Sequence, residues 1–264
     1  MAGILYVCAT PIGNLEDITL RALRILREVD LIAAEDTRHT RKLLSHYDIH
    51  TPLTSYHEHN AREKGAYLVE QLRQGKNIAL VSDAGTPGIS DPGTLLIQAA
   101  IAAGIPVVPV PGATAFVTAL CVSGLSTEKF VFEGFLPRKD QERKKRLEEL
   151  GREERTVILY EAPHRLRATL KAIKEVLPGR RLVVARELTK QFEEVLRGTP
   201  EELWAHFEAH PPKGEFTLLL EARPPGEGRE DPALQEDQDP VALVASLEEQ
   251  GLSGQEAIKE AAKR

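Results

Sequence analysis

Two patterns of hydrophobic and polar positions alternate along the chain. Short, continuous apolar runs rich in β-branched residues are followed by longer segments in which apolar residues recur at helical spacing. In the first half, the short runs predict strands over 4–10, 31–35, 52–57, 77–83 and 107–110, and the longer segments predict helices over 18–29, 38–46, 61–74 and 94–103. Continuous apolar strands separated by helices indicate a parallel sheet covered on both faces.

A second set of elements begins after a break near Ser123–Thr127. It predicts strands over 130–135, 156–161, 181–187, 193–197 and 215–221, and helices over 141–150, 165–177 and 200–210. The sequence therefore predicts an α/β fold with two α/β domains, over 1–123 and 124–222. Residues 223–239 have the proline-rich and acidic composition of a linker, and 240–264 regain helical spacing, which predicts a short helical C-terminal appendage.

Composition narrows the class of protein. The net charge of −6 argues against a surface that is basic throughout, but nucleic acid binds to local charge, and 138–146 is a basic cluster. Cys8 and Cys121 lie in apolar segments and are expected to be small buried hydrophobes, without a disulfide framework, which favours the cytoplasm. No apolar run approaches the ~18–20 residues of a membrane span, and the N-terminal segment lacks the basic flank of a signal peptide.

The turn from Ser82 to Gly93 is the strongest candidate for ligand binding. It follows a buried strand, and ligands of open parallel sheets bind beyond the carboxyl ends of the strands. Its glycines allow close approach of the backbone to a ligand, and its prolines stiffen the turn. We expect Asp83 to meet a ribose hydroxyl or an ammonium group. The turn is not a phosphate-binding P-loop because no lysine follows the glycines, and GxGxxG is also absent.

Five other segments at strand ends carry polar or turn-forming residues. Thr10–Asn14 is typical of an ordinary turn, and 109–115 is consistent either with ligand-facing amides at a helix start or with close helix packing. In 34–41, Asp36 or Thr37 is a possible helix N-cap, while Arg38 and Arg41 share one helix face and are suited to a phosphate. In the second domain, 160–165 and 186–190 are expected at the same end of one sheet, as a second wall of a shared cleft.

Other kinds of site find no support in the sequence. The two histidines in 55–60 do not have the spacing of a zinc site, so no metal is expected. A GxSxG nucleophile elbow is also absent.

Seven strings in a fixed order carry a resemblance to a known family. They are CATPIGNLEDIT, AEDTRHT, SDAGTPGISDPG, PVPGATA, YEAPHR, ARELTKQFEE and GEFTLLLE, between about residues 4 and 222. The chain resembles the tetrapyrrole-methylase superfamily of class III methyltransferases, and within it the branch of small-subunit (16S) ribosomal-RNA cytidine 2′-O-methyltransferases. Relatives that methylate precorrins usually carry GxGxGD and GDP where this chain has TPIGN and SDAG, which favours the RNA branch.

The resemblance implies the cofactor, the partners and the site. The cofactor is S-adenosylmethionine, held in a cleft between the domains, the partner is ribosomal RNA or the small subunit, and the protein is a homodimer. The implied cofactor-binding residues are Pro11, Asp83, Gly85, Thr86, Ile89, Ala113, Thr114, Tyr160, Glu161, Ala162 and Thr217.

Methylation of a ribose hydroxyl benefits from a base that accepts its proton. The candidates are Asp36, Glu35 and Glu187, with His57 behind them, and the position of Asp36 beside two arginines favours it. The residues expected to contact RNA are Arg38, Arg41, Arg186, Lys190, Arg138, Lys139, Lys144 and Lys145.

Two alternatives remain open. In the first, the chain is a methyltransferase whose acceptor is a precorrin or the diphthamide precursor. In the second, the chain is a non-catalytic module that binds the cofactor as a sensor.

Overall fold

The computed structural model describes residues 1–223 and 253–255, and Met1–Ala222 form one unit. Within these residues the chain forms two five-stranded sheets with helices against them, which confirms the predicted α/β class. The expected linker over 223–239 and the expected appendage over 240–264 lie outside the described residues, except at 223 and 253–255.

The first sheet is parallel throughout, as the apolar runs predict. Its strand order is β3-β2-β4-β1-β5, with β1 (Leu5–Cys8), β2 (Leu31–Ala34), β3 (Leu53–Ser55), β4 (Ile78–Val81) and β5 (Val107–Val110). Because all strands run the same way, the turns after β1, β2, β4 and β5 emerge at one edge. The regions that the sequence singles out in this half follow these strands.

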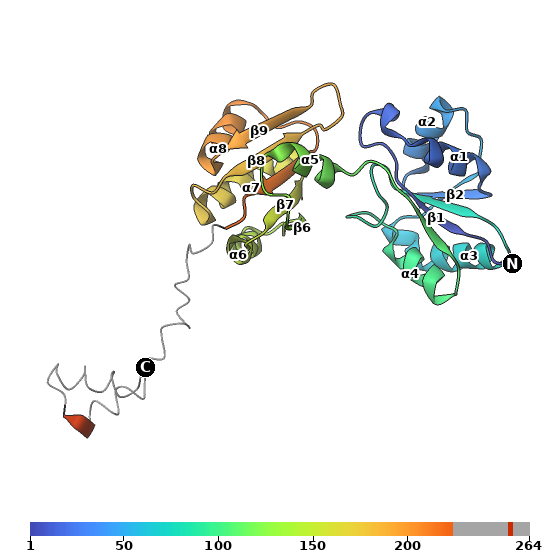
Figure 1. Ribbon diagram of the computed structural model, residues 1–264, viewed down its shortest axis with the longest axis horizontal. Helices are drawn as coiled ribbons and strands as arrows, with labels where there is room; N and C mark the ends of the chain where they lie inside the picture. Colours follow the sequence, from blue (N-terminus) through green and yellow to red (C-terminus); the bar gives the residue numbers. More distant parts are fainter. Residues whose placement is uncertain (224–252, 256–264) are drawn as a thin grey trace. The chain divides into compact units, whose positions relative to one another are not determined.

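Helices cover both faces of the first sheet (Figure 1). One face is covered by α1 (Leu20–Glu28) and α2 (Thr37–His46), and the other by α3 (Ala61–Arg73) and α4 (Thr94–Ala102). Two short 3-10 helices, η1 (Leu15–Asp17) and η2 (Glu58–Asn60), precede α1 and α3 in the sequence. The central strand β4 contributes side chains to the cores on both faces of the sheet. Ile78 and Leu80 pack with α3 and α4, and Ala79 and Val81 pack with α1 and α2. Alternate side chains of a strand point to opposite faces, so a strand buried on both sides is apolar at every position.

The second sheet is mixed. Its order is β6-β7-β10-β8-β9, with β6 (Phe130–Phe135), β7 (Thr156–Glu161), β8 (Leu182–Arg186), β9 (Glu194–Gly198) and β10 (Phe216–Leu220). β10 is antiparallel to both β7 and β8, so these two strands run in the same direction. Their last residues, Glu161 and Arg186, both pair with Phe216. The two second-domain segments singled out by sequence therefore do lie at the same end of one sheet.

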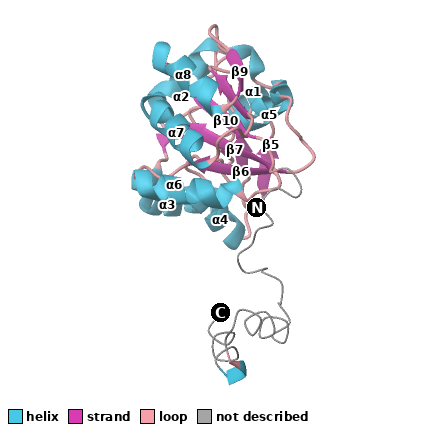
Figure 2. Ribbon diagram, turned by 90° about the vertical axis from the view of Figure 1, so that its left-hand side faces the viewer, coloured by secondary structure: helices cyan, strands magenta, loops and turns pink. Residues whose placement is uncertain are grey.

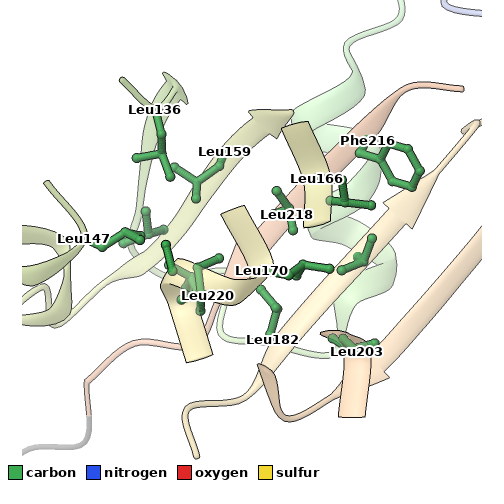
Figure 3. Packing of buried hydrophobic residues seen from close by; sticks show 14 of the residues in the cluster. Leu136, Leu147, Leu159, Leu166, Leu170, Leu182, Leu203, Phe216, Leu218 and Leu220 are labelled. Atoms are coloured by element: carbon green, nitrogen blue, oxygen red, sulfur yellow. The ribbon is translucent and has the colours of Figure 1, made fainter. Parts of the chain in front are cut away.

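The faces of the second sheet are also both covered. α6 (Asp140–Gly151), α7 (Pro163–Val176) and α8 (Pro200–Ala209) enclose one face in a leucine-rich core, and α5 (Ala115–Ser123) packs on the other (Figures 2 and 3). In β10, Phe216, Leu218 and Leu220 belong to the leucine-rich core, whereas Leu219 packs with α5. Thr217 shares the side of Leu219 because strand side chains alternate.

The helix α5 belongs to the second sheet by its packing. Its Ala119 and Leu120 lie in one buried cluster with Ile158 and Val183 of the second sheet, although the sequence places α5 before the expected domain boundary at 123/124. That boundary stays a prediction. Ile12 joins the same cluster, so the turn after β1 reaches the apolar face of the second sheet.

The two cysteines differ in exposure. Cys8 is buried in β1, and burial raises the pKa of its thiol to about 12. Cys121 is exposed, so the prediction that it is buried is wrong. It lies on the face of α5 that does not carry Ala119 and Leu120, and a single apolar face is enough to hold a helix on a sheet. Within residues 1–223 and 253–255, no helix has the length and apolarity needed to span a bilayer.

Candidate functional site

The turns after β1 and β4 are joined by backbone hydrogen bonds. The Thr10 amide donates to the Gly85 carbonyl at 2.9 Å, and the Gly85 amide donates to the Thr10 carbonyl at 3.1 Å. Gly85 has a φ of +84°, in the left-handed region that favours glycine, and a Cβ there would lie 3.4 Å from Ile12. The glycine therefore allows the two turns to pack together at the carboxyl edge of the sheet.

The turn after β4 is also bound to the turn after β5. The Thr86 hydroxyl lies 2.8 Å from the Thr114 hydroxyl and 3.3 Å from the Ala113 carbonyl. Thr114 is the N-cap of α5, and Thr86 lies in the turn between β4 and α4. These contacts bring together two segments that the sequence identifies separately.

A cavity of about 460 Å³ lies at this junction. Its walls come from the first sheet's turns and from the carboxyl ends of β7 and β8, which supports the expected cleft with two walls. The predicted cofactor-binding residues that line it are Asp83, Gly85, Thr86, Ile89, Thr114, Tyr160, Glu161, Ala162 and Thr217. Of the other two, Pro11 lines a neighbouring cavity, and Ala113 contributes its carbonyl to Thr86.

The second sheet contributes an aromatic and a buried acidic wall. Burial raises the pKa of Tyr160 to about 12, its hydroxyl accepts a hydrogen bond of 3.2 Å from the Phe116 amide, and its ring packs edge-on against Phe135. Glu161 is buried, with partners at both carboxylate oxygens: Thr169 donates at 2.6 Å and the Ala162 amide at 2.9 Å. Glu161 thus shapes the wall and orders the start of α7.

Carboxylates dominate the charge of the cavity. Glu35, Asp83, Asp91, Glu161 and Glu215 line it, and none of the described residues in its walls is basic. Burial raises the pKa of Asp91 to about 7, and the nearby charges of Glu35 and Asp83 raise it further, against a hydrogen bond from Ser82. Burial and the charge of Asp83 also raise the pKa of Glu35. Arg165 pairs with Glu161 at 3.3 Å and Lys190 with Glu215 at 2.9 Å, which leaves Glu35, Asp83 and Asp91 as the carboxylates of this wall without an ion pair in the described part of the chain. Carboxylates without a cationic partner suit a cationic ligand and repel a phosphate.

Asp91 is a site residue that the sequence did not single out. It lies in the predicted turn, but nothing in its local pattern distinguishes it from an ordinary turn aspartate. Three apolar residues that line the cavity were also not predicted as site residues: Ile12, Phe135 and Leu188. Tertiary packing brings them to the cavity.

The three candidates for a catalytic base have different surroundings. Glu35 lines the cavity. Of the two expected N-cap candidates, Asp36 caps α2. Its carboxylate accepts hydrogen bonds from Arg38 Nε and Nη2 at 3.2 and 3.0 Å, which lowers its pKa to about 2. Asp36 is absent from the cavity wall.

Glu187 is also outside the cavity wall. Burial alone would raise its pKa, but hydrogen bonds from the Lys190 ammonium and the Glu215 amide outweigh burial and lower it. His57 lies close enough to Glu35 for its charge to affect the pKa of that carboxyl group. Its ring is held by Asn60 at 3.3 Å.

The predicted RNA-contacting residues separate into paired and unpaired cations. Arg38 binds Asp36, Arg186 contacts the Lys213 carbonyl and Glu194, and Lys190 lies between Glu187 and Glu215. In the basic cluster, Lys139 pairs with Glu142, and Lys144 with Asp140 and Glu175. The predicted contacts whose side chains have no such partner among the described residues are Arg41, Arg138 and Lys145.

Comparison with known proteins gives one family and a consistent set of relatives. The chain matches the tetrapyrrole (corrin/porphyrin) methylases over residues 4–203. It is 57% identical over 224 residues to a Synechocystis protein named ribosomal RNA small subunit methyltransferase I, covering 84% of this chain and 80% of that protein. A protein of the same name from Halalkalibacterium halodurans is 52% identical over 263 residues, covering 98% and 90%.

Solved structures show the same fold at low sequence identity. A cobalt precorrin-4 methyltransferase superposes with a TM-score of 0.63 at 17% identity, covering 83% of this chain and 94% of that one. A diphthine synthase superposes with a TM-score of 0.62 at 14% identity, covering 83% and 90%.

Proposed function

Because the chain belongs to the family of tetrapyrrole (corrin/porphyrin) methylases, we propose that it transfers a methyl group from S-adenosylmethionine to small-subunit (16S) ribosomal RNA, at the ribose 2′-oxygen of a cytidine. The observation that carries this proposal is the identity of 52% over 98% of the chain with a relative named for that RNA. The structural neighbours named for precorrin and diphthine are 17% and 14% identical, and at that level only the fold is shared.

The residues of the 460 Å³ cavity fit S-adenosylmethionine. Its volume falls within the ~300–1,000 Å³ common for ligand sites. The sulfonium and ammonium groups of this cofactor are positive, and the cavity offers the carboxylates of Glu35, Asp83 and Asp91 with no basic side chain among its described wall residues. The Phe135 and Tyr160 rings offer an apolar surface for the adenosine.

When bound, S-adenosylmethionine supplies a methyl group that is already activated on sulfur. The contribution of the protein is to orient the acceptor oxygen and to receive its proton. We assign the proton to the Glu35 carboxylate, because Glu35 lines the cavity and burial raises its pKa. A carboxylate that is poorly solvated is a stronger base than one held in an ion pair, as Asp36 and Glu187 are.

We further propose that RNA contacts the unpaired cations Arg41, Arg138 and Lys145, and that the protein acts in the cytoplasm as a homodimer. Exposed apolar side chains support self-association: Leu95 and Ile101 on α4, and Val117 and Val122 on α5. Sedimentation of the wild type at micromolar concentration tests the dimer, and a monomeric mass contradicts it.

The proposed activity is tested with unmodified small ribosomal subunits and labelled S-adenosylmethionine. We expect label in the RNA, and mapping of the modified nucleotide to give a cytidine methylated on its ribose. Large subunits serve as the control acceptor. Transfer to a precorrin or a diphthamide precursor, with none to RNA, would support another branch of the family, and cofactor binding without any transfer would support a sensor.

A further inference from the structure

A second cavity, of about 360 Å³, lies beside the proposed cofactor cavity. Its walls come from the turn after β1, from α2 and from the start of the turn after β4. Only Pro11 and Asp83 among the predicted cofactor-binding residues line it. The proposed cofactor site therefore does not account for most of this cavity.

Thr40 marks this cavity as a polar site. Thr40 lines the cavity, the residue is 3% exposed, and its buried hydroxyl has no hydrogen-bond partner among the described residues. A threonine in a helix commonly bonds the carbonyl of the preceding turn, but here the Asp36 carbonyl accepts only the Thr40 amide, at 3.0 Å. A buried hydroxyl is costly without a partner, so a polar ligand in this cavity would satisfy it.

The charge of this cavity differs from that of the cofactor cavity. His39 and Lys42 lie three residues apart on α2, both line the cavity, and neither side chain has a hydrogen bond or ion pair among the described residues. Lys190 also lines it, but its ammonium lies 2.9 Å from both Glu187 and Glu215. Lys42 is therefore the cation available to an anionic group such as a phosphodiester.

The two cavities share a wall. Ile12, Asp83, Ala84 and Glu215 line both. The two cavities therefore adjoin at these four residues. Methyl transfer requires the acceptor oxygen to come within ~3–3.5 Å of the methyl carbon, so the acceptor site must lie next to the cofactor site.

Gly13 allows the Lys190 side chain to pack against the turn after β1. A Cβ at Gly13 would lie 2.3 Å from Lys190 Cγ and 2.9 Å from Lys190 Cε, so the lysine stem lies directly on the glycine. The turn after β1 and the turn after β8 meet at this contact, and both supply wall residues. This contact explains why a glycine suits the TPIGN turn, and the local sequence does not reveal it.

We propose that the 360 Å³ cavity binds the acceptor ribonucleotide, with the Thr40 hydroxyl bonded to a polar group of the nucleoside and Lys42 bound to a flanking phosphate. The assignment rests on the proposed function, because it takes RNA to be the acceptor. The RNA nucleotide is thereby placed in a cavity next to the cofactor cavity and not in the cofactor cavity itself.

The test compares Thr40→Val with Thr40→Ser, and Lys42→Gln with Arg62→Gln. The serine variant keeps the hydroxyl, and Arg62 is an exposed arginine of α3 outside both cavities. We expect Thr40→Val and Lys42→Gln to raise the KM for small subunits about three- to tenfold, while their Kd for S-adenosylmethionine stays within about twofold of the wild type. Thr40→Ser and Arg62→Gln should resemble the wild type in both measurements.

Binding without turnover provides a second measurement. The anisotropy of a labelled small-subunit rRNA fragment, with S-adenosylhomocysteine present, should show weaker binding for Thr40→Val and Lys42→Gln than for their controls. Equal RNA binding and equal KM in all variants would overturn the assignment, as would a loss of cofactor affinity as large as the loss of RNA affinity. If the wild type transfers no methyl group to RNA, the proposed function fails, whereas the anisotropy still decides whether this cavity binds RNA.

Discussion

The carboxylate of Asp83 accepts a hydrogen bond of 2.9 Å from the backbone amide of Asp36. Asp83 follows β4 and Asp36 follows β2, and these strands are neighbours in the first sheet. One side chain thus connects the turn of the proposed cofactor cavity to the start of α2, which lines the proposed acceptor cavity.

Replacement of Asp83 should separate its two roles. Asp83→Ala removes the acceptor of the Asp36 amide and should lower the free energy of unfolding by about 1–2 kcal/mol. Asp83→Asn keeps an oxygen that can accept this hydrogen bond but removes the charge, so it should be closer to the wild type in stability. Both variants should bind S-adenosylmethionine more weakly. Urea denaturation and calorimetry measure these effects, and an alanine variant as stable as the wild type would show that the hydrogen bond contributes little.

Glu35 and Asp36 should differ as catalytic groups. Glu35→Gln removes the proposed base and should lower kcat by about 10²- to 10⁴-fold. Asp36→Asn should leave kcat nearly unchanged, since asparagine caps a helix about as well as aspartate. Single-turnover transfer to small subunits, at saturating cofactor, measures the chemical step. A loss in Asp36→Asn as large as that in Glu35→Gln would return the role to Asp36.

Asp91 should make the stability of the cofactor-free protein depend on pH near neutrality. Its pKa is raised from 3.8 to about 7 by burial and by Glu35 and Asp83. The folded state therefore holds a proton that the unfolded state has released, and the stability that this proton provides is lost as pH rises through 7. The melting temperature should fall between pH 6 and pH 8 by a few degrees more in the wild type than in Asp91→Asn. Parallel pH profiles for the two proteins would contradict this expectation.

The same carboxyl group should couple cofactor binding to pH. Deprotonation above pH 7 adds a negative charge to a cavity proposed to hold a cation, so the affinity for S-adenosylmethionine should rise through this range. Asp91→Asn should bind more weakly at pH 8 and show a flatter dependence. The neutral analogue 5′-methylthioadenosine is the matched control ligand, and its affinity should change little with pH. If both ligands show the same profile, Asp91 does not act through charge.

Two glycines in the left-handed region offer a matched pair for backbone effects. Gly214 has a φ of +89°, and a Cβ there would lie 2.3 Å from Glu187 Cδ, whereas Gly179 has a φ of +73° and open space around it. Gly179→Ala should cost about 1–2 kcal/mol from conformation alone. Gly214→Ala should cost about 1–3 kcal/mol more, because Glu187 must move away from Lys190 and the Glu215 amide. Equal losses in chemical denaturation would show that Glu187 rearranges freely.

Local sequence determined much of this protein. The apolar runs and helical spacings identified the strands of both sheets and their helices except α5, of which only a possible start was recognised. Burial of a strand or a helix face leaves a periodic record in the residues themselves. The glycine- and proline-rich turn after β4 was likewise visible, since a backbone that must approach a ligand or turn sharply requires those residue types. Asp36 and Thr37 were recognisable as N-cap candidates for the same reason, and the structure assigns the cap to Asp36.

Tertiary structure decided which of these residues meet. The pKa of Asp36 is lowered by its ion pair with Arg38, which depends on the direction of the two side chains. The burial that raises the pKa of Asp91 and the contact of Lys190 with Gly13 depend on packing between segments. A one-dimensional pattern records whether a position is buried, but not which neighbour buries it. The sheet against which a helix packs decides which side of the helix is buried. The sequence alone therefore did not reveal that Cys121 is exposed or that the hydroxyl of Thr40 is buried without a partner among the described residues.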